Sequence, residues 1–179
     1  MPQEGGSQNN TIAHSVFTDI SASAVSIGRT NTYNITNRSQ HDADNTISDC
    51  QVTNVASEFH GAPGFAVFYA RGTSLVHNEI SMLPYTAVSI GWGWGRTMEI
   101  TWPNMPWDSA NDISHNNIHD VMMMLGDGGS IYTLGPQGNV PFPKVKHASQ
   151  CPSDRMLLID VPNDRVLLIQ PLLTLKTGD

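Results

Sequence analysis

Charge is scarce in this chain, above all positive charge. Only 14% of the 179 residues are charged, and Lys+Arg number 9 against 16 for Asp+Glu. Nucleic-acid binding depends on clustered lysines and arginines that neutralise phosphates, and the few basic residues here are not clustered that way. The composition therefore predicts no nucleic-acid partner, whereas an acidic surface suits a neutral or cationic ligand.

Long hydrophobic runs are missing, and cysteines are few. No run of about 18 apolar residues exists, so we expect no membrane span. The opening residues MPQEGGSQNN lack the basic start and apolar centre of a signal peptide. The two cysteines, Cys50 and Cys151, do not have the spacing of a metal site, and we expect neither a metal nor a cofactor. For Cys50 a buried free thiol is favoured over a disulfide.

Turn-forming residues and an internal repeat are what the sequence does contain. The chain has 15 glycines and 11 prolines, and the segment AVSIG occurs at residues 24–28 and again at 87–91. At the same offset Ile12 matches Leu75 and Phe17 matches Ile80, and the same apolar frame starts again at Ile47 and at Ile113. Isolated apolar positions among Asn, Ser, Thr and Gly predict short strands, not helices.

This repeat predicts an all-β fold, namely a right-handed parallel β-helix (solenoid) fragment of about four coils. Stacked coils share one core that a single coil could not form. The coils are assigned to residues 9–140, and residues 1–8 are predicted to be a disordered N-terminal end. Residues 141–179 are an atypical tail, either a hairpin that caps the last coil or a disordered segment.

Several motifs point to a family. The segments LPYT at 83–86, GWGWG at 91–95, HDVM at 119–122 and DGGSIYTLG at 127–135 resemble right-handed parallel β-helix glycoside hydrolases of the fucosidase/xylanase or β-xylosidase type. The resemblance covers roughly residues 45–138 and is incomplete, because the repeat stops soon after the DGG element. It implies an oligo- or polysaccharide substrate, catalytic carboxylates, and an extracellular or secreted protein.

Two acidic residues are the candidate catalysts. Stacked coils lie about 4.7–4.9 Å apart, so Glu58 and Asp127, on corners two coils apart, are expected roughly 9–10 Å from each other. Inverting glycosidases hold their two carboxyl groups about 6.5–9.5 Å apart. We predict Asp127 as one catalytic carboxylate and Glu58 as the second, or as a hydrogen-bonding partner of the substrate. The alternative is that Asp127 only forms a turn with Gly128 and Gly129.

Aromatic residues are candidate sugar-binding groups. Trp92 and Trp94 are two residues apart among glycines, so they share one face of a strand. Flat rings suit stacking on the apolar C–H faces of sugars. The alternative is an aromatic plug against a neighbouring loop, and Tyr85 and Tyr132 are open to the same two interpretations.

Histidines near the expanded corners complete the candidate site. His60 lies two residues after Glu58 in a Gly/Pro-rich loop, and His119 precedes the second corner, so both could contact substrate. Asp120 is an alternative acid. The histidines at 14, 77 and 115 recur at equivalent positions, which indicates a polar stack and not a ligand set.

The predicted function is a glycan-acting glycoside hydrolase module that uses carboxylate acid/base catalysis, with activity of this incomplete chain left open. One alternative is a non-catalytic carbohydrate-binding or structural β-helix protein. Another is a polysaccharide lyase or epimerase, which would need a basic residue and often a cage of carboxylates around Ca²⁺. The arginines at 29, 71 and 96 are scattered, which ranks that reading last.

Overall fold

A computed structural model describes residues 6–30, 37–92, 110–134, 144–146, 155–161 and 164–170. Within these ranges the chain is all-β, as predicted, apart from one short 3-10 helix, η1 (Arg38–Gln40). No helix in the described part of the chain is long and apolar enough to cross a membrane.

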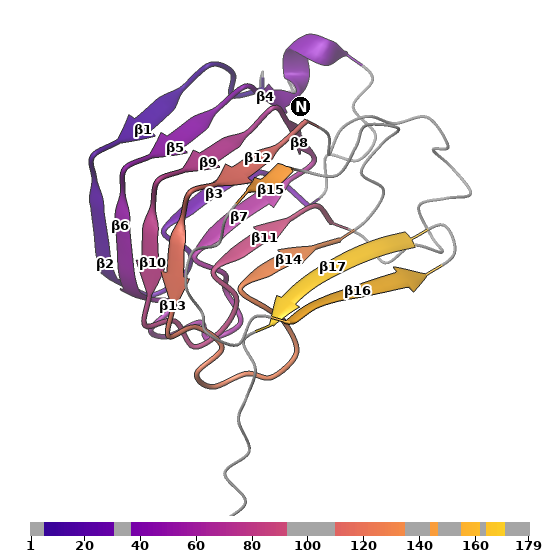
Figure 1. The fold of residues 1–179 in the computed structure, drawn as a ribbon. Coiled ribbons are helices and arrows are strands. Elements are labelled where there is room, and N and C mark those ends of the chain that lie inside the picture. Colours follow the sequence, from indigo (N-terminus) through magenta and orange to yellow (C-terminus); the bar gives the residue numbers. More distant parts are fainter. Residues whose placement is uncertain are drawn as a thin grey trace, which may run out of the picture.

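Three main sheets contain most of the strands, and the chain passes through them in turn (Figure 1). The first sheet contains β1 (Thr11–Ala13), β5 (Thr46–Ser48), β9 (Ser74–Val76), β12 (Asp112–Ser114) and β15 (Lys144–Lys146). The second contains β2 (Val16–Ile20), β6 (Gln51–Val55), β10 (Glu79–Ser81) and β13 (Asn117–His119). The third contains β3 (Val25–Gly28), β7 (Phe65–Phe68), β11 (Val88–Ile90), β14 (Ile131–Thr133), β16 (Arg155–Val161) and β17 (Asp164–Gln170). A small pair is formed by β4 (Asp42–Ala43) and β8 (Ala70–Arg71). We call one passage through the three main sheets a round.

The prediction of a right-handed parallel β-helix fragment of about four coils is wrong. The described strands form four separate short sheets, of five, four, six and two strands. The six-stranded sheet is also not purely parallel, because β17 pairs antiparallel with both β14 and β16. The apolar frame specifies which residues pair between strands. It does not specify at which residues bends end the strands, or that the tail adds strands to the edge of the third sheet.

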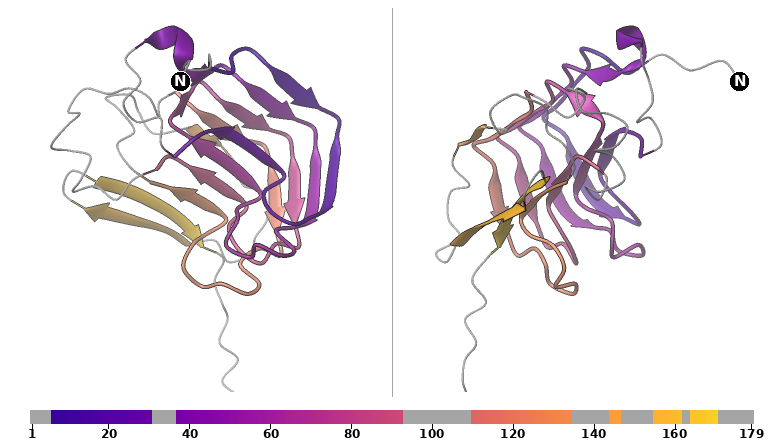
Figure 2. Two further views of the ribbon diagram at one scale, coloured as in Figure 1. Left: turned by 180° about the vertical axis from the view of Figure 1, so that it is seen from behind. Right: turned by 90° about the vertical axis from the view of Figure 1, so that its right-hand side faces the viewer.

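The two apolar runs of the tail form β16 and β17, and β17 lies between β16 and β14 (Figures 1 and 2). Residues 1–5 of the predicted disordered end lie outside the described residues, as do most of residues 135–154 and 171–179. The division of the chain at residues 8 and 140 stays a prediction.

The alignment of the repeats is confirmed by the strand pairing. In the first sheet Ile12 pairs with Ile47, Ile47 with Leu75, and Leu75 with Ile113. The second sheet aligns Phe17, Val52, Ile80 and Ile118 in the same way. These side chains meet those of the third sheet in one hydrophobic core, where most are almost fully buried. Each such burial contributes about 1.5–3 kcal/mol, so the core positions fix the register.

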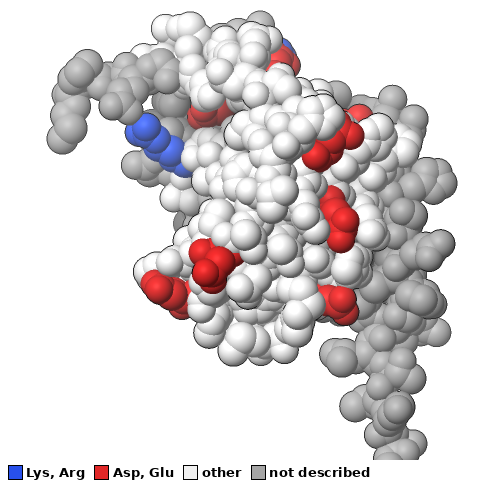
Figure 3. All heavy atoms as spheres, turned by 90° about the vertical axis from the view of Figure 1, so that its left-hand side faces the viewer, with Lys and Arg blue, Asp and Glu red and all other residues white. Residues whose placement is uncertain are grey.

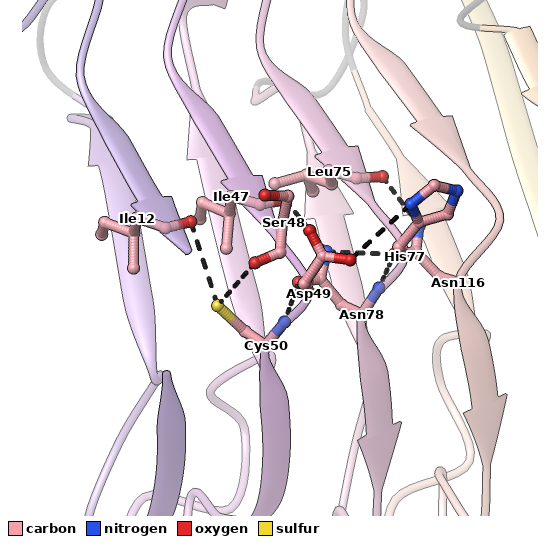
Figure 4. Close-up of polar contacts among 9 residues, drawn as sticks. All are labelled: Ile12, Ile47, Ser48, Asp49, Cys50, Leu75, His77, Asn78 and Asn116. Atoms are coloured by element: carbon pink, nitrogen blue, oxygen red, sulfur yellow. Dashed lines mark hydrogen bonds and ion pairs between the residues drawn. The ribbon is translucent and has the colours of Figure 1, made fainter. Parts of the chain in front are cut away.

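Buried asparagines hold the bend between the first and second sheets (Figure 4). Asn78 donates to the carbonyl of Ile47 at 3.0 Å and accepts the amide of Cys50 at 3.0 Å. Asn116 does the same one round later, accepting the amide of Asn78 at 2.9 Å and donating to the carbonyl of Leu75 at 2.8 Å. Cys50 takes the equivalent place one round earlier, and its thiol lies 3.1 Å from the carbonyl of Ser48. It is free and buried, as predicted, whereas Cys151 lies outside the described residues.

The recurring histidines sit at a left-handed bend. His14, Asp49, His77 and His115 precede the second-sheet strands of successive rounds and have φ of 51°, 53°, 56° and 59°. Among residues other than glycine, Asn, Asp and His adopt this conformation most readily. The polar stack predicted for these positions is present: His77 lies 3.7 Å from Asp49, and its ring centroid is 5.0 Å from that of His115.

Candidate functional site

The candidate site lies along the edge where the chain turns from the second sheet to the third. The connections after β6 and β13 are long, and those after β2 and β10 are short. Each long connection is tied to the short one of the preceding round. The amides of Glu58 and Phe59 donate to the carbonyl of Ser21, and the amides of Met124 and Leu125 donate to that of Pro84. The long loop after β13 projects furthest at this edge (Figure 1).

The turn that contains Asp127 is packed against the short connection between β10 and β11 in the preceding round. The phenol of Tyr85 donates to the backbone carbonyl of Asp127 at 2.5 Å. The next residue, Gly128, is so close that a Cβ there would lie 2.5 Å from Oγ1 of Thr86 and 2.7 Å from Cε2 of Tyr85. Only glycine fits such an approach. The turn is therefore held firmly while the Asp127 side chain stays exposed.

Two tyrosines share the surroundings of Asp127. Burial raises the pKa of Tyr85, a hydrogen bond with the Thr86 side chain partly offsets this, and the charge of Asp127 adds to the increase. Burial also raises the pKa of Tyr132, with further increases from Tyr85 and Asp127. Both phenols are thus neutral hydrogen-bond donors near pH 7. The structure brings together three residues predicted from the sequence.

Glu58 and His60 occupy the other long loop. Glu58 is exposed, and the Nε2 atom of His60 lies 3.1 Å from the carbonyl of Ser57. Because β6 and β13 are two strands apart in the second sheet, these strands lie about 9–10 Å from each other. Among the described residues, no hydrogen bond or ion pair joins Glu58 or His60 to Asp127.

His119 and Asp120 form a charged cluster with a residue that the sequence analysis missed. The Nδ1 atom of His119 lies 2.9 Å from Asp120, and its Nε2 atom lies 3.7 Å from Glu79. The hydrogen bond to Asp120 raises the pKa of His119, burial partly opposes this, and the charges of Asp120 and Glu79 add to the increase. The strand register offered a signal for Glu79, since it pairs with Asn117 and is a diagonal neighbour of His119.

Trp92 is 38% exposed and packs edge-to-face on Phe68, with ring centroids 5.2 Å apart. The partner is a residue of β7, and part of the ring is open to solvent. Residues 93–109 lie outside the described residues, so packing against that loop stays a prediction. Trp94 lies outside the described residues.

Large apolar side chains are exposed along the same edge as Asp127. They are Phe59, Met82, Met123, Met124 and Leu125, with exposed fractions between 39% and 64%. Met122, which precedes the exposed Met123, is partly buried and packs against the hydrophobic core.

Charge on the second-sheet side of the molecule is mostly acidic and dispersed (Figure 3). In the ranges described by the structure, no group of three or more His, Cys, Asp or Glu residues is arranged to hold a metal ion.

No protein-family model matches the chain, and no curated protein matches it. A solved structure described as a glycoside hydrolase is similar, with a TM-score of 0.65 and 26% sequence identity. The match covers 73% of this chain but only 22% of the other one, so the chain corresponds to a small part of that protein. The resemblance to glycoside hydrolases is confirmed in this general form.

Sequence reasoning found Asp127, Tyr85 and Tyr132, which lie together, and missed the residues that hold them. Thr86 was overlooked because a buried threonine next to a tyrosine has no distinctive pattern. Its nearness to the DGG element depends on the pairing of β11 with β14, which aligns Val88 with Ile131.

Proposed function

We propose that this chain is a glycoside-hydrolase-like module that cleaves glycosidic bonds, with Asp127 as one catalytic carboxylate. The observation that supports this most strongly is the turn at Asp127, which a hydrogen bond from Tyr85 holds in place. Beside it lie two tyrosines whose pKa values are raised. A carboxylate on a fixed turn is suited to proton transfer or nucleophilic attack. The Tyr85 proton is donated to the Asp127 carbonyl, so Tyr85 holds the turn, and its oxygen can still accept a hydrogen bond from a sugar hydroxyl group. Similarity to a glycoside hydrolase structure gives independent support.

Glu58 is the proposed second carboxylate. The separation of about 9–10 Å between β6 and β13, which lead into the two loops, is close to the upper end of the range for inverting enzymes, which leaves room for a water molecule. The exposed methionines would contact the C–H faces of sugar rings. Trp92 follows the far end of β11, so it would contact a sugar only where the substrate extends along the third sheet. His60, His119 and Asp120 are proposed to contact the substrate along the same edge. The resemblance also leads us to propose an extracellular site of action.

The test is hydrolysis of a panel of aryl glycosides and oligosaccharides by the purified chain and by Asp127→Asn. Loss of general acid/base catalysis typically lowers the rate about 10²–10⁴-fold. Asp49→Asn is the matched control, because Asp49 is an exposed aspartate at a different bend of the same fold. Equal turnover by wild type and Asp127→Asn would rule out this assignment.

A non-catalytic carbohydrate-binding module is the second candidate. It is favoured by the absence, within the described ranges, of any contact linking Glu58 to the Asp127 cluster. Sugar binding by calorimetry without turnover, and with Asp127→Asn binding equally well, would select this candidate.

A polysaccharide lyase ranks third. Removing a proton next to a carboxyl group requires a base, and the raised pKa values of Tyr85 and Tyr132 oppose the formation of a phenolate near pH 7.

A further inference from the structure

We propose that Thr86 is the positioning residue of this site, and that its hydroxyl group fixes the loop that carries Asp127. This inference rests on the proposed function for its catalytic consequence, but not for its structural content. Thr86 is fully buried on the short connection between β10 and β11, directly beneath the long loop after β13.

The hydroxyl contacts both ends of that loop. It lies 3.7 Å from the sulfur of Met122, where the loop begins, and 3.4 Å from the amide of Gly129, where it ends. Gly128 approaches the same oxygen so closely that a Cβ on it would lie 2.5 Å away. One buried atom therefore contacts both ends of the segment that presents Asp127.

The chemistry of a hydroxyl explains why threonine serves here. Its single proton can be donated to the Met122 sulfur or to the Tyr85 phenol, while its lone pairs accept the Gly129 amide. Tyr85 in turn donates to the Asp127 carbonyl. Thr86 is thus connected to Asp127 through Gly129, and also through Tyr85 when its proton points to the phenol.

The backbone of Thr86 also reaches the other long loop. Its carbonyl accepts the amide of Gly64 at 3.0 Å, and Gly64 ends the connection that carries Glu58. The same residue therefore anchors the Asp127 loop through its side chain and the Glu58 loop through its main chain. It is placed to set the separation of the two proposed carboxylates.

Three variants of the whole chain test this. Thr86→Val keeps the shape and removes the hydroxyl, and Thr86→Ser keeps the hydroxyl. Thr73→Val is the control, because Thr73 is equally buried but its Oγ1 has no hydrogen-bond partner in the described structure. If Thr86→Val does not fold, Thr86→Ala removes the same hydroxyl without a methyl group against the Gly129 amide.

The first measurement is steady-state turnover of the best aryl glycoside. A misplaced catalytic group costs up to about 10²-fold, so we expect kcat of Thr86→Val to fall about 10- to 100-fold with KM changed less than about threefold. Thr86→Ser and Thr73→Val should stay within about threefold of wild type. Normal kcat in Thr86→Val, or a serine variant as slow as valine, would overturn the proposal.

The second measurement is hydrogen exchange of the Gly129 amide, which does not require activity. Loss of its acceptor should speed exchange about tenfold or more in Thr86→Val, and Thr73→Val should leave it unchanged. Unaltered protection overturns the positioning role. A wild-type chain that cleaves no glycoside, combined with faster exchange in Thr86→Val, would refute the proposed function and retain Thr86 as the anchor of the loop.

Discussion

The two long loops on the edge between the second and third sheets begin alike and end differently. Each carries a carboxylate, Glu58 in one and Asp127 in the other, and each is tied by backbone amides to the preceding round. Each loop has one glycine with open space around it, Gly61 in the first and Gly126 in the second. The tightly packed glycine of the first loop, Gly64, approaches the following round, whereas Gly128 in the second is pressed against two side chains of the preceding round. The repeat thus places a carboxylate at this edge in both loops. Among the described residues, only the second loop is held by side chains of the preceding round, namely Tyr85 and Thr86. Catalytic groups need this kind of fixed geometry.

The largest effect is expected from exchanging the two carboxylates for amides. Asp127→Asn should reduce turnover about 10²–10⁴-fold, because it removes a proposed catalytic group. Glu58→Gln should reduce it less, by about tenfold, if Glu58 binds substrate, and by a similar 10²–10⁴-fold if it is the second catalyst. Single-turnover kinetics on one aryl glycoside would distinguish these results. If both variants lost turnover equally and only slightly, the proposed catalytic difference between the two loops would be refuted.

The next effect concerns packing beneath the loops. A methyl group on Gly128 meets Oγ1 of Thr86 and the ring of Tyr85, so Gly128→Ala should destabilise the fold by about 1–3 kcal/mol. Gly61→Ala, and Gly126→Ala within the same loop, should change stability by less than about 0.5 kcal/mol, because nothing lies within 4 Å of either new methyl group. Urea unfolding measures all three. Similar stability for Gly128→Ala and Gly61→Ala would show that the second loop is not tightly packed against Thr86 and Tyr85.

Removal of one hydroxyl group should have a smaller effect. Tyr85→Phe loses the hydrogen bond to the Asp127 carbonyl, which typically costs about 0.5–1.5 kcal/mol. We expect a lower unfolding midpoint and slower turnover with KM little changed. Tyr69→Phe is the control for turnover alone, since Tyr69 is a buried tyrosine outside the two long loops.

The smallest effect is the pH dependence contributed by His119, which precedes the second loop. Its pKa is raised in the folded state, chiefly by the hydrogen bond to Asp120, so the protonated form stabilises the fold. This contribution is complete below the unfolded pKa of about 6.5 and is lost as pH rises through the higher folded value. His119 is 37% exposed, so the contribution is only a few tenths of a kcal/mol. His119→Gln should therefore be destabilising at pH 5 and nearly neutral at pH 9 in thermal unfolding.

His60→Gln provides the comparison from the first loop. The contact described for His60 is the Ser57 carbonyl, not a carboxylate. A loss of stability in this variant at pH 5 as large as that of His119→Gln would contradict the assigned cause.

The sequence was most informative where apolar burial fixes the structure. The alignment of Ile12, Ile47, Leu75 and Ile113 was predictable because each must face the core, and a shift by one residue would expose all of them. The all-β character followed from the same pattern. The division into four sheets did not, since it depends on where short strands end and on an antiparallel addition of β17 that no repeat encodes.

In the candidate site, the sequence identified the residues that carry chemistry but not the residues that hold them in place. Asp127 and the two tyrosines stand out by residue type, whereas Thr86 and Glu79 matter only through neighbours in other rounds. Such neighbours are set by the pairing of β11 with β14 and of β10 with β13. A local motif cannot reveal them.

The left-handed bends before the second sheet have an evolutionary consequence. Aspartate occupies this position in one round and histidine in the others, with φ between 51° and 59° throughout. Because the backbone there requires only a residue that tolerates positive φ, an acid, a base or an amide can be exchanged without moving a strand. This row of positions lets natural variation alter the charge of one side of the protein while its architecture is inherited unchanged.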